Sequence, residues 1–182
     1  MKKIGKILLV LLLGVVVTVG CGKKENVAKN QIENISLSEE GLGTVTFTYP
    51  QSLAFSLSEE KYIHNAETNE EKSIYTIYSP DYLLTMNMEM RLTGTDDIQR
   101  LVEENKNTEA FKKYNWGKYE GYSYGEKDEL RFTIVLDKSD IGIATVIEGF
   151  TRSNDLNKTT IQLFNEKGIQ DLFKSLKYKK VG

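Results

Sequence analysis

The 182-residue sequence contains one cysteine, one histidine and two prolines. A single cysteine excludes a disulfide within the chain, and a single histidine excludes the histidine pairs that build many zinc sites. The sequence also has no Asp-x-Asp-x-Asp-Gly calcium loop, no glycine-rich phosphate loop and no Gly-x-Ser-x-Gly nucleophile motif. We therefore expect a protein without a metal, a cofactor or a catalytic centre.

The sequence has no excess of basic residues, with 24 basic against 26 acidic side chains and a formal net charge of -2. Proteins that bind nucleic acids concentrate lysine and arginine to neutralise phosphates, so we expect no nucleic-acid partner. Because 40% of the residues are hydrophobic and 27% are charged, the composition is typical of one globular domain with a real core.

The first twenty residues differ from this average composition. Three lysines, Lys2, Lys3 and Lys6, precede an apolar run over residues 7–19, which is the layout of a secretory signal peptide. At about 1.5 Å per residue this run reaches only about 20 Å, and a hydrocarbon core is roughly 30 Å thick. We therefore predict that residues 1–20 are a signal peptide and not a permanent membrane span.

The only cysteine follows directly, in the tetrapeptide Thr18-Val19-Gly20-Cys21. It resembles the lipobox of bacterial lipoproteins, although Thr18 stands where leucine is usual. The resemblance implies that Cys21 becomes the new N-terminus and carries a diacylglyceryl group, whose two acyl chains give stable attachment. The protein would then lie at the extracytoplasmic face of the cell membrane. The alternative is an ordinary buried cysteine beside an ordinary signal peptide.

The remaining chain is predicted to consist of a polar tether, residues 21–42 with the lipid-anchored cysteine at its start, and a single α+β domain, residues 43–182. Alternation of apolar and polar residues predicts strands at 44–50, 73–79, 83–92, 117–124, 130–137 and 141–150. A helix is predicted at 96–113, with Thr93 and Thr95 as candidate N-caps. A second helix face is formed near the C-terminus by Ile169, Leu172, Phe173 and Leu176.

The clearest strand pair is the hairpin around the polar segment Asp-Lys-Ser-Asp, for which we place Asp137 opposite Asp140. The core face of this hairpin would carry Leu130, Phe132, Ile134, Leu136, Ile141, Ile143, Thr145 and Ile147. The other face would pair Glu129 with Glu148, Arg131 with Val146 and Thr133 with Ala144. Arg131 would then lie diagonal to Glu148 and within its reach.

The two ends of the domain resemble the PsbP-like family. The residues that carry the likeness are Phe47, Tyr49 and Pro50 in the first strand and Leu172, Phe173, Ser175, Leu176 and Tyr178 near the C-terminus. The resemblance covers about residues 42–180 and implies an antiparallel β-sheet flanked by helices, an αβα sandwich. Since these are packing positions, it implies no particular chemistry.

Two groups are candidate ligand-binding residues. The first is the aromatic segment 114–124, in which Trp116 and Tyr119 suit sugar or peptide contacts. The alternative is that Tyr122 and Tyr124 point into the core while the other rings line a turn. The second is the mixed sheet face that holds Arg91, Arg131 and Glu148. A structural ion-pair network is the alternative for this face, because partly buried charges must be paired.

These features predict a lipid-anchored, non-catalytic binding or assembly module. Its partners would be the membrane, through the anchor, and another envelope protein or cell-wall glycan. The alternative is an envelope hydrolase or an enzyme accessory factor that uses carboxylates and the aromatic cluster.

Overall fold

The computed structural model describes residues 32–126 and 128–181. The signal peptide, Cys21 and most of the predicted tether lie outside the described residues. The elements are β1 (Ile32–Glu39), β2 (Gly43–Pro50), η2 (Gln51–Leu53), β3 (Ser56–Asn65), β4 (Glu70–Ser79), β5 (Leu84–Gly94), α1 (Thr95–Asn105), β6 (Lys112–Trp116), β7 (Tyr119–Gly125), β8 (Glu129–Lys138), β9 (Ile143–Ser153), α2 (Thr160–Phe164), α3 (Lys167–Lys174) and β10 (Lys177–Lys180). This is mostly antiparallel sheet with a few helices, which agrees with the predicted α+β class.

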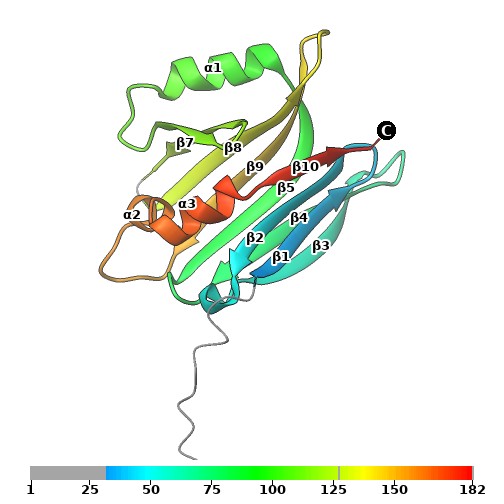
Figure 1. The fold of residues 1–182 in the computed structure, drawn as a ribbon. Helices are drawn as coiled ribbons and strands as arrows, with labels where there is room; N and C mark the ends of the chain where they lie inside the picture. Colours follow the sequence, from blue (N-terminus) through cyan, green and yellow to red (C-terminus); the bar gives the residue numbers. More distant parts are fainter. Residues whose placement is uncertain (1–31, 127, 182) are drawn as a thin grey trace, which may run out of the picture.

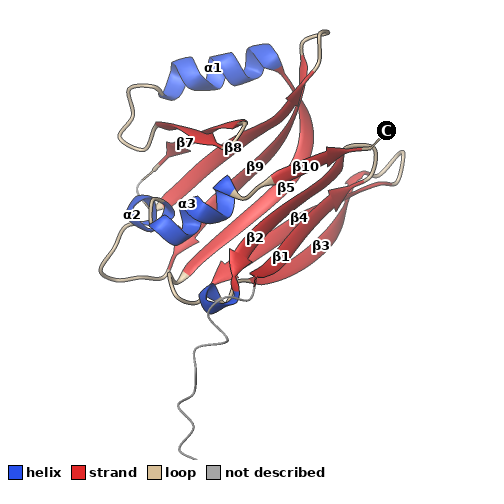
Figure 2. Ribbon diagram, in the orientation of Figure 1, coloured by secondary structure: helices blue, strands red, loops and turns tan. Residues whose placement is uncertain are grey.

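The strands form two sheets (Figures 1 and 2). The large sheet has the strand order β3-β4-β5-β9-β8-β7-β6, and the small sheet has the order β1-β2-β10. All strand pairs among the described residues are antiparallel. The small sheet and the helices α2 and α3 cover one face of the large sheet, whereas α1 lies over part of the other face.

The main core fills the space between the large sheet and the layer of α2, α3 and the small sheet. Every second residue of β5 points into it, so Met86, Met88 and Met90 are almost completely buried. They pack in the same cluster as Phe47 of β2 and Phe173 of α3. The methionine-rich side of this strand is therefore core, where burial of each such side chain contributes about 1.5–3 kcal/mol.

A smaller core lies on the other face of the large sheet, beneath α1. Its buried residues are Ile98, Tyr122, Val135, Ala144 and Val146. Since α1 is only eleven residues long, it covers one end of the face and leaves the rest accessible.

The predicted boundary at residue 43 is wrong, because the small sheet begins at Ile32. Ile35 and Leu37 alternate with polar residues and are buried in the main core, so this segment is a strand that pairs with β2 along its whole length. Because every second residue of this strand is polar, its overall composition resembles that of a polar tether.

The predicted helix at 96–113 is shorter than expected, since α1 ends at Asn105 and residues 112–116 form β6. The predicted N-caps are also corrected: the N-cap is Gly94 and no side chain caps the helix. Thr95 instead donates its hydroxyl hydrogen bond to the carbonyl oxygen of Gly142, 3.2 Å away. That bond ties the start of α1 to the β8–β9 loop.

The β8–β9 hairpin has a different register from the predicted one. Thr133 lies opposite Glu148 and Arg131 opposite Phe150, whereas Ala144 was expected opposite Thr133. From Glu129 to Val135 the difference is four residues, an even number, so the side chains of this part of the hairpin keep their predicted faces. Arg131 and Glu148 therefore do lie diagonally on one face, as expected.

A longer turn explains the difference in register. The strands continue to Lys138 and Ile143, and a bulge interrupts the ladder between Val135 and Asp137. The hairpin closes through a four-residue loop in which Gly142 has a φ of +80°. The predicted core positions Ile141 and Ile143 are wrong, because the side chain of Ile141 is 81% exposed in this loop and Ile143 is also exposed.

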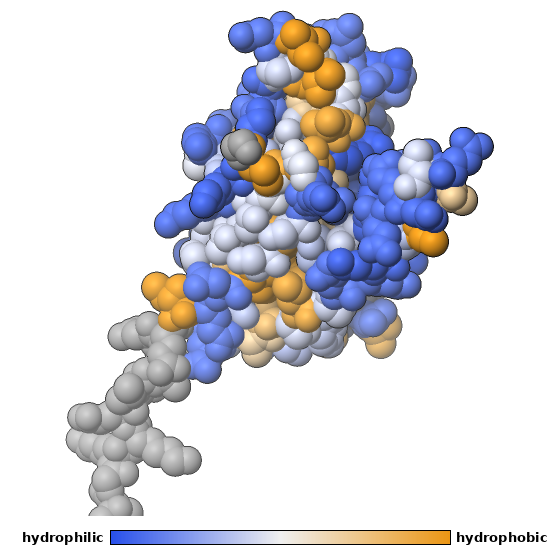
Figure 3. Space-filling view, turned by 90° about the vertical axis from the view of Figure 1, so that its right-hand side faces the viewer, coloured by the Kyte–Doolittle hydropathy of each residue, from blue (hydrophilic) through white to orange (hydrophobic). Residues whose placement is uncertain are grey.

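Strand β3 forms one edge of the large sheet and was not among the strands predicted from the sequence. Nearly all of its residues are exposed, and charged side chains such as Glu59, Glu60 and Lys61 lie at its centre. Such charges discourage edge-to-edge pairing between molecules. Hydrophilic residues cover much of the side of the molecule that carries β3, and apolar residues gather there in smaller patches (Figure 3).

Candidate functional site

The part of the large sheet that faces away from the main core, beside and beneath α1, is here named the open face. Strand alternation places on this face every second side chain of β5, β9, β8 and β7. Its central residues are Asn87, Glu89, Arg91, Glu148, Phe150, Arg131, Thr133 and Tyr124. The mixed face predicted from the sequence is thus assembled as expected.

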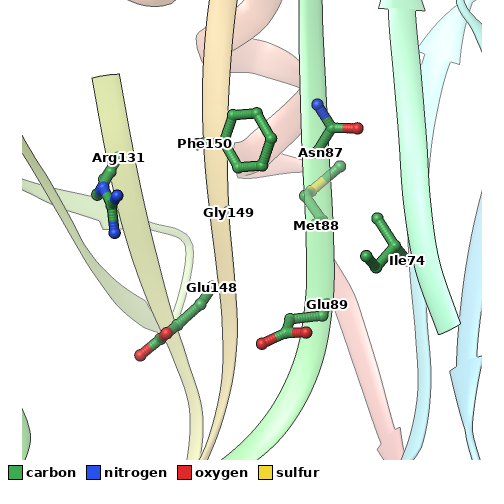
Figure 4. Close-up of a pocket in the computed structure, with 8 residues that line it drawn as sticks. All are labelled: Ile74, Asn87, Met88, Glu89, Arg131, Glu148, Gly149 and Phe150. Atoms are coloured by element: carbon green, nitrogen blue, oxygen red, sulfur yellow. The ribbon is translucent and has the colours of Figure 1, made fainter. Parts of the chain in front are cut away.

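Two hollows lie side by side on the open face. The smaller has a volume of about 260 Å³, with Ile74 and Phe150 as apolar wall residues and Glu89, Glu148 and Arg131 as charged ones (Figure 4). The larger, of about 400 Å³, lies between α1 and the sheet. Glu148 lines both hollows, so together they form one interrupted groove.

The charges on the open face are not evenly matched. Glu89 of β5 lies directly opposite Glu148 of β9. An Arg91 Nη atom donates to Glu148 Oε1 over 2.7 Å, and this ion pair separates the two hollows. Glu89 forms no ion pair with any described residue and accepts one hydrogen bond, from the hydroxyl of Tyr62 at 3.2 Å. Since like charges directly opposite each other destabilise a sheet, this pair costs stability.

Two tyrosine hydroxyls border this group of charges. Burial, followed by the negative charge of Glu89, raises the pKa of the Tyr62 hydroxyl above its usual value. Burial also raises the pKa of Tyr124, which lines the larger hollow. Both side chains are therefore neutral hydrogen-bond donors at neutral pH, and neither supplies a base.

Arg131 lies on the opposite rim of the smaller hollow from Glu89. Its nearest carboxylate is that of Glu129, at 3.9 Å. The same carboxylate accepts a hydrogen bond from Arg152 Nε at 3.0 Å, so it is already engaged. The guanidinium of Arg131 is therefore only weakly paired. The buried Nε of Arg91 has no hydrogen-bond partner among the described residues.

The structure does not place the aromatic cluster on a surface. Trp116 is 1% exposed and Tyr119 is 4% exposed, and both belong to the main core. The Trp116 ring stacks on Phe173 with centroids 4.6 Å apart, and its Nε1 donates to the side chain of Gln170 at 2.9 Å. The expected ligand-binding role of Trp116 and Tyr119 is therefore corrected to a packing role.

A glycine explains why the Trp116 ring can be buried. Gly121 lies on the neighbouring strand β7, and a Cβ atom there would come within 2.1 Å of the Trp116 ring. The absent side chain makes room for the indole. Of the two tyrosines expected in the core, Tyr122 lies in the smaller core and Tyr124 borders the larger hollow.

Within residues 32–126 and 128–181, no three His, Cys, Asp or Glu side chains come together as a metal site. Across the same part of the chain, no helix has the length and apolar character needed to cross a bilayer.

Two residues of the open face were not recognised from the sequence. Phe150 and Tyr62 reach it only through the register of β9 and β3 with their neighbours. The alternation of Asn87, Glu89 and Arg91 along one strand was the sequence pattern that predicted a shared face for these three residues.

Comparisons of the chain with protein-family models, curated proteins and solved structures found no match.

Proposed function

We propose that this protein is an extracytoplasmic lipoprotein that acts as a non-catalytic binding module and uses the open face as its binding surface. The proposal joins two separate parts, an anchor and a surface. The anchor derives from the amino-acid pattern around Cys21, and the surface derives from the residues of β5, β8 and β9.

Support for the anchor comes from the lysines, the apolar run and the tetrapeptide that ends at Cys21. Since β1 begins at Ile32, ten residues lie between the cysteine and the domain. Even a fully extended chain of ten residues reaches only about 35 Å, so the domain would stay close to the bilayer. At this distance, ligands that belong to the membrane or to the envelope are within reach.

Support for the binding role comes mainly from one observation. Glu89 and Arg131 face the same hollow, have opposite charges and are both poorly paired within the described part of the chain. The Arg131 side chain is 62% exposed and Glu89 is half-buried, so both charges are accessible to a ligand. A partner that supplies a charge of opposite sign to each residue fits this arrangement.

A PsbP-like arrangement is part of the proposal. In its favour, a central antiparallel sheet has α1 on one face and α2 with α3 on the other. The three-stranded small sheet shares the second layer with those helices, which differs from a layer made of helices alone. The solved structure of a close relative would decide the family.

Quantitative capture from the native membrane tests the binding role. The intact lipoprotein and a Glu89→Gln/Arg131→Gln double variant are compared by mass spectrometry of the co-purified envelope components. We expect the double variant to lose the components that the natural protein retains. A Glu40→Gln variant, altered at an exposed turn, is the matched control. Identical capture by all three proteins would contradict the proposal, and turnover by the purified domain would favour the hydrolase alternative.

Cell fractionation with a Cys21→Ser variant tests the anchor. The natural protein is expected in the membrane fraction with a diacylglyceryl group on Cys21, visible in its intact mass. The variant is expected to leave that fraction or to retain residues 1–20. An unmodified cysteine in membrane-bound natural protein would refute the anchor.

A further inference from the structure

The smaller hollow has one unmatched charge of each sign, and its charged residues come from three strands. Glu89 extends from β5 and Arg131 from β8, on either side of β9, which contributes Glu148 and Phe150 (Figure 4). We infer that this hollow binds a dipeptide with a free ammonium group and a free carboxylate. The inference rests on the proposed binding function and names the class of its ligand.

The ammonium group would lie beside Glu89 and Glu148. These two carboxylates face each other across neighbouring strands, and Arg91 neutralises one charge of the pair. Among the described residues, no second cation forms an ion pair with either carboxylate. An ammonium group with three donors can bond to Glu89 and share Glu148 with Arg91, which removes the like-charge repulsion when the ligand is bound.

The carboxylate would lie beside Arg131. A planar guanidinium binds a carboxylate with two parallel hydrogen bonds. Among the described residues, Glu129 is the one acid within 4 Å of Arg131, and it is already bonded to Arg152. A ligand carboxylate therefore competes with a weak contact at 3.9 Å and not with a strong ion pair.

The spacing of the strands sets the length of the ligand. β5 and β8 are separated by β9, so they lie about 10 Å apart, and Glu89 and Arg131 are offset by two residues, about 7 Å along the strands. Their Cα atoms are thus about 12 Å apart. The Glu89 and Arg131 side chains bridge part of this span. Two extended residues, about 7 Å long, fit the remainder better than one residue of about 3.5 Å.

The centre of the hollow suits the middle of a dipeptide. Asn87 accepts a hydrogen bond from the Thr76 hydroxyl at 2.7 Å through its amide oxygen, so its amide nitrogen remains free to donate. In Figure 4 this nitrogen points toward the side of Phe150. It could therefore bond to the peptide carbonyl, while Phe150 and Ile74 provide apolar contact for one side chain.

Calorimetric titration of the complete mature protein with alanyl-leucine tests this inference. We expect saturable binding with a Kd of about 1 mM or lower. N-acetylation of the dipeptide should weaken binding about tenfold, and so should C-amidation, because each removes one charged hydrogen-bonded contact. Free leucine should bind more weakly than the dipeptide.

Two variants identify which end of the ligand each residue binds. In Glu89→Gln, acetylation should no longer weaken binding, whereas amidation still should. In Arg131→Gln the pattern should reverse, and Glu40→Gln should behave as the natural protein does. The inference would be overturned if both variants were weakened by acetylation and by amidation as the natural protein is. It would also be overturned if the natural protein showed no saturable binding. If peptides fail to bind while capture from the membrane still depends on Glu89 and Arg131, only the ligand class is wrong and the proposed function stands.

Discussion

Replacing Glu89 with glutamine should stabilise the folded protein, although it removes a residue of the proposed site. Glu89 lies opposite Glu148 in the ladder of β5 and β9. Two carboxylates about 6 Å apart repel each other by about 0.7 kcal/mol in bulk water and by about 3 kcal/mol at an effective dielectric constant near 20. Arg91, bonded to Glu148, offsets part of this repulsion. We therefore expect the free energy of unfolding to rise by about 0.5–1 kcal/mol.

Urea unfolding at two salt concentrations measures this effect. In about 0.1 M salt the Glu89→Gln variant should have the higher midpoint with an unchanged slope. In about 1 M salt the repulsion between the two carboxylates is screened, so most of the gain should disappear. Tyr62 can still donate to the glutamine amide oxygen, so its hydrogen bond does not obscure the comparison.

Glu60→Gln is the control for this experiment, because Glu60 on β3 lies opposite Ile74 and has no like charge across the ladder. Its unfolding free energy should change by less than about 0.5 kcal/mol at both salt concentrations. A destabilised Glu89→Gln variant, or a gain that persists unchanged in about 1 M salt, would refute the reasoning.

Three further predictions concern the packing and the pH dependence of the fold. Gly121→Ala should lower the free energy of unfolding, measured by urea denaturation, by about 3 kcal/mol, because the new Cβ would lie 2.1 Å from the Trp116 ring. A loss below about 1 kcal/mol would contradict this packing. Thr159→Ala should lower the free energy by about 1 kcal/mol, since it breaks the capping box with Gln162 at the start of α2, and an unchanged midpoint would speak against the cap. Burial raises the pKa of the Tyr49 hydroxyl to about 12, so the fold disfavours the phenolate and stability should fall as the pH rises from 10 to 12. Tyr49→Phe should show a smaller fall in urea titrations, and an equal fall would exclude Tyr49 as the cause.

The strands of the large sheet could be predicted where apolar and polar residues alternate strictly. Met86, Met88 and Met90 point into the core for this reason, and Arg131 and Glu148 share the other face. The helix face at the C-terminus could be predicted on the same grounds, since Ile169, Leu172 and Phe173 of α3 are buried. Periodicity is local, so the sequence alone carries this part of the fold.

Contacts between distant segments could not be predicted in this way. β1 contains only two buried apolar residues between polar ones, and its strand character depends on pairing with β2. The burial of Trp116 depends on Gly121, which faces it from the next strand. The facing of Glu89 and Glu148 depends on the register between β5 and β9, which no local pattern specifies.

Photo-crosslinking from Phe150 tests most directly whether the open face binds a partner. Phe150 lines the smaller hollow, so p-benzoylphenylalanine in its place keeps an aromatic ring there. Leu156, the most exposed large apolar side chain at 99%, is the reference position. In the native envelope we expect an adduct from position 150 that position 156 does not form and that Glu89→Gln/Arg131→Gln abolishes. No adduct from position 150, or one unaffected by the double substitution, would contradict a binding role for the open face.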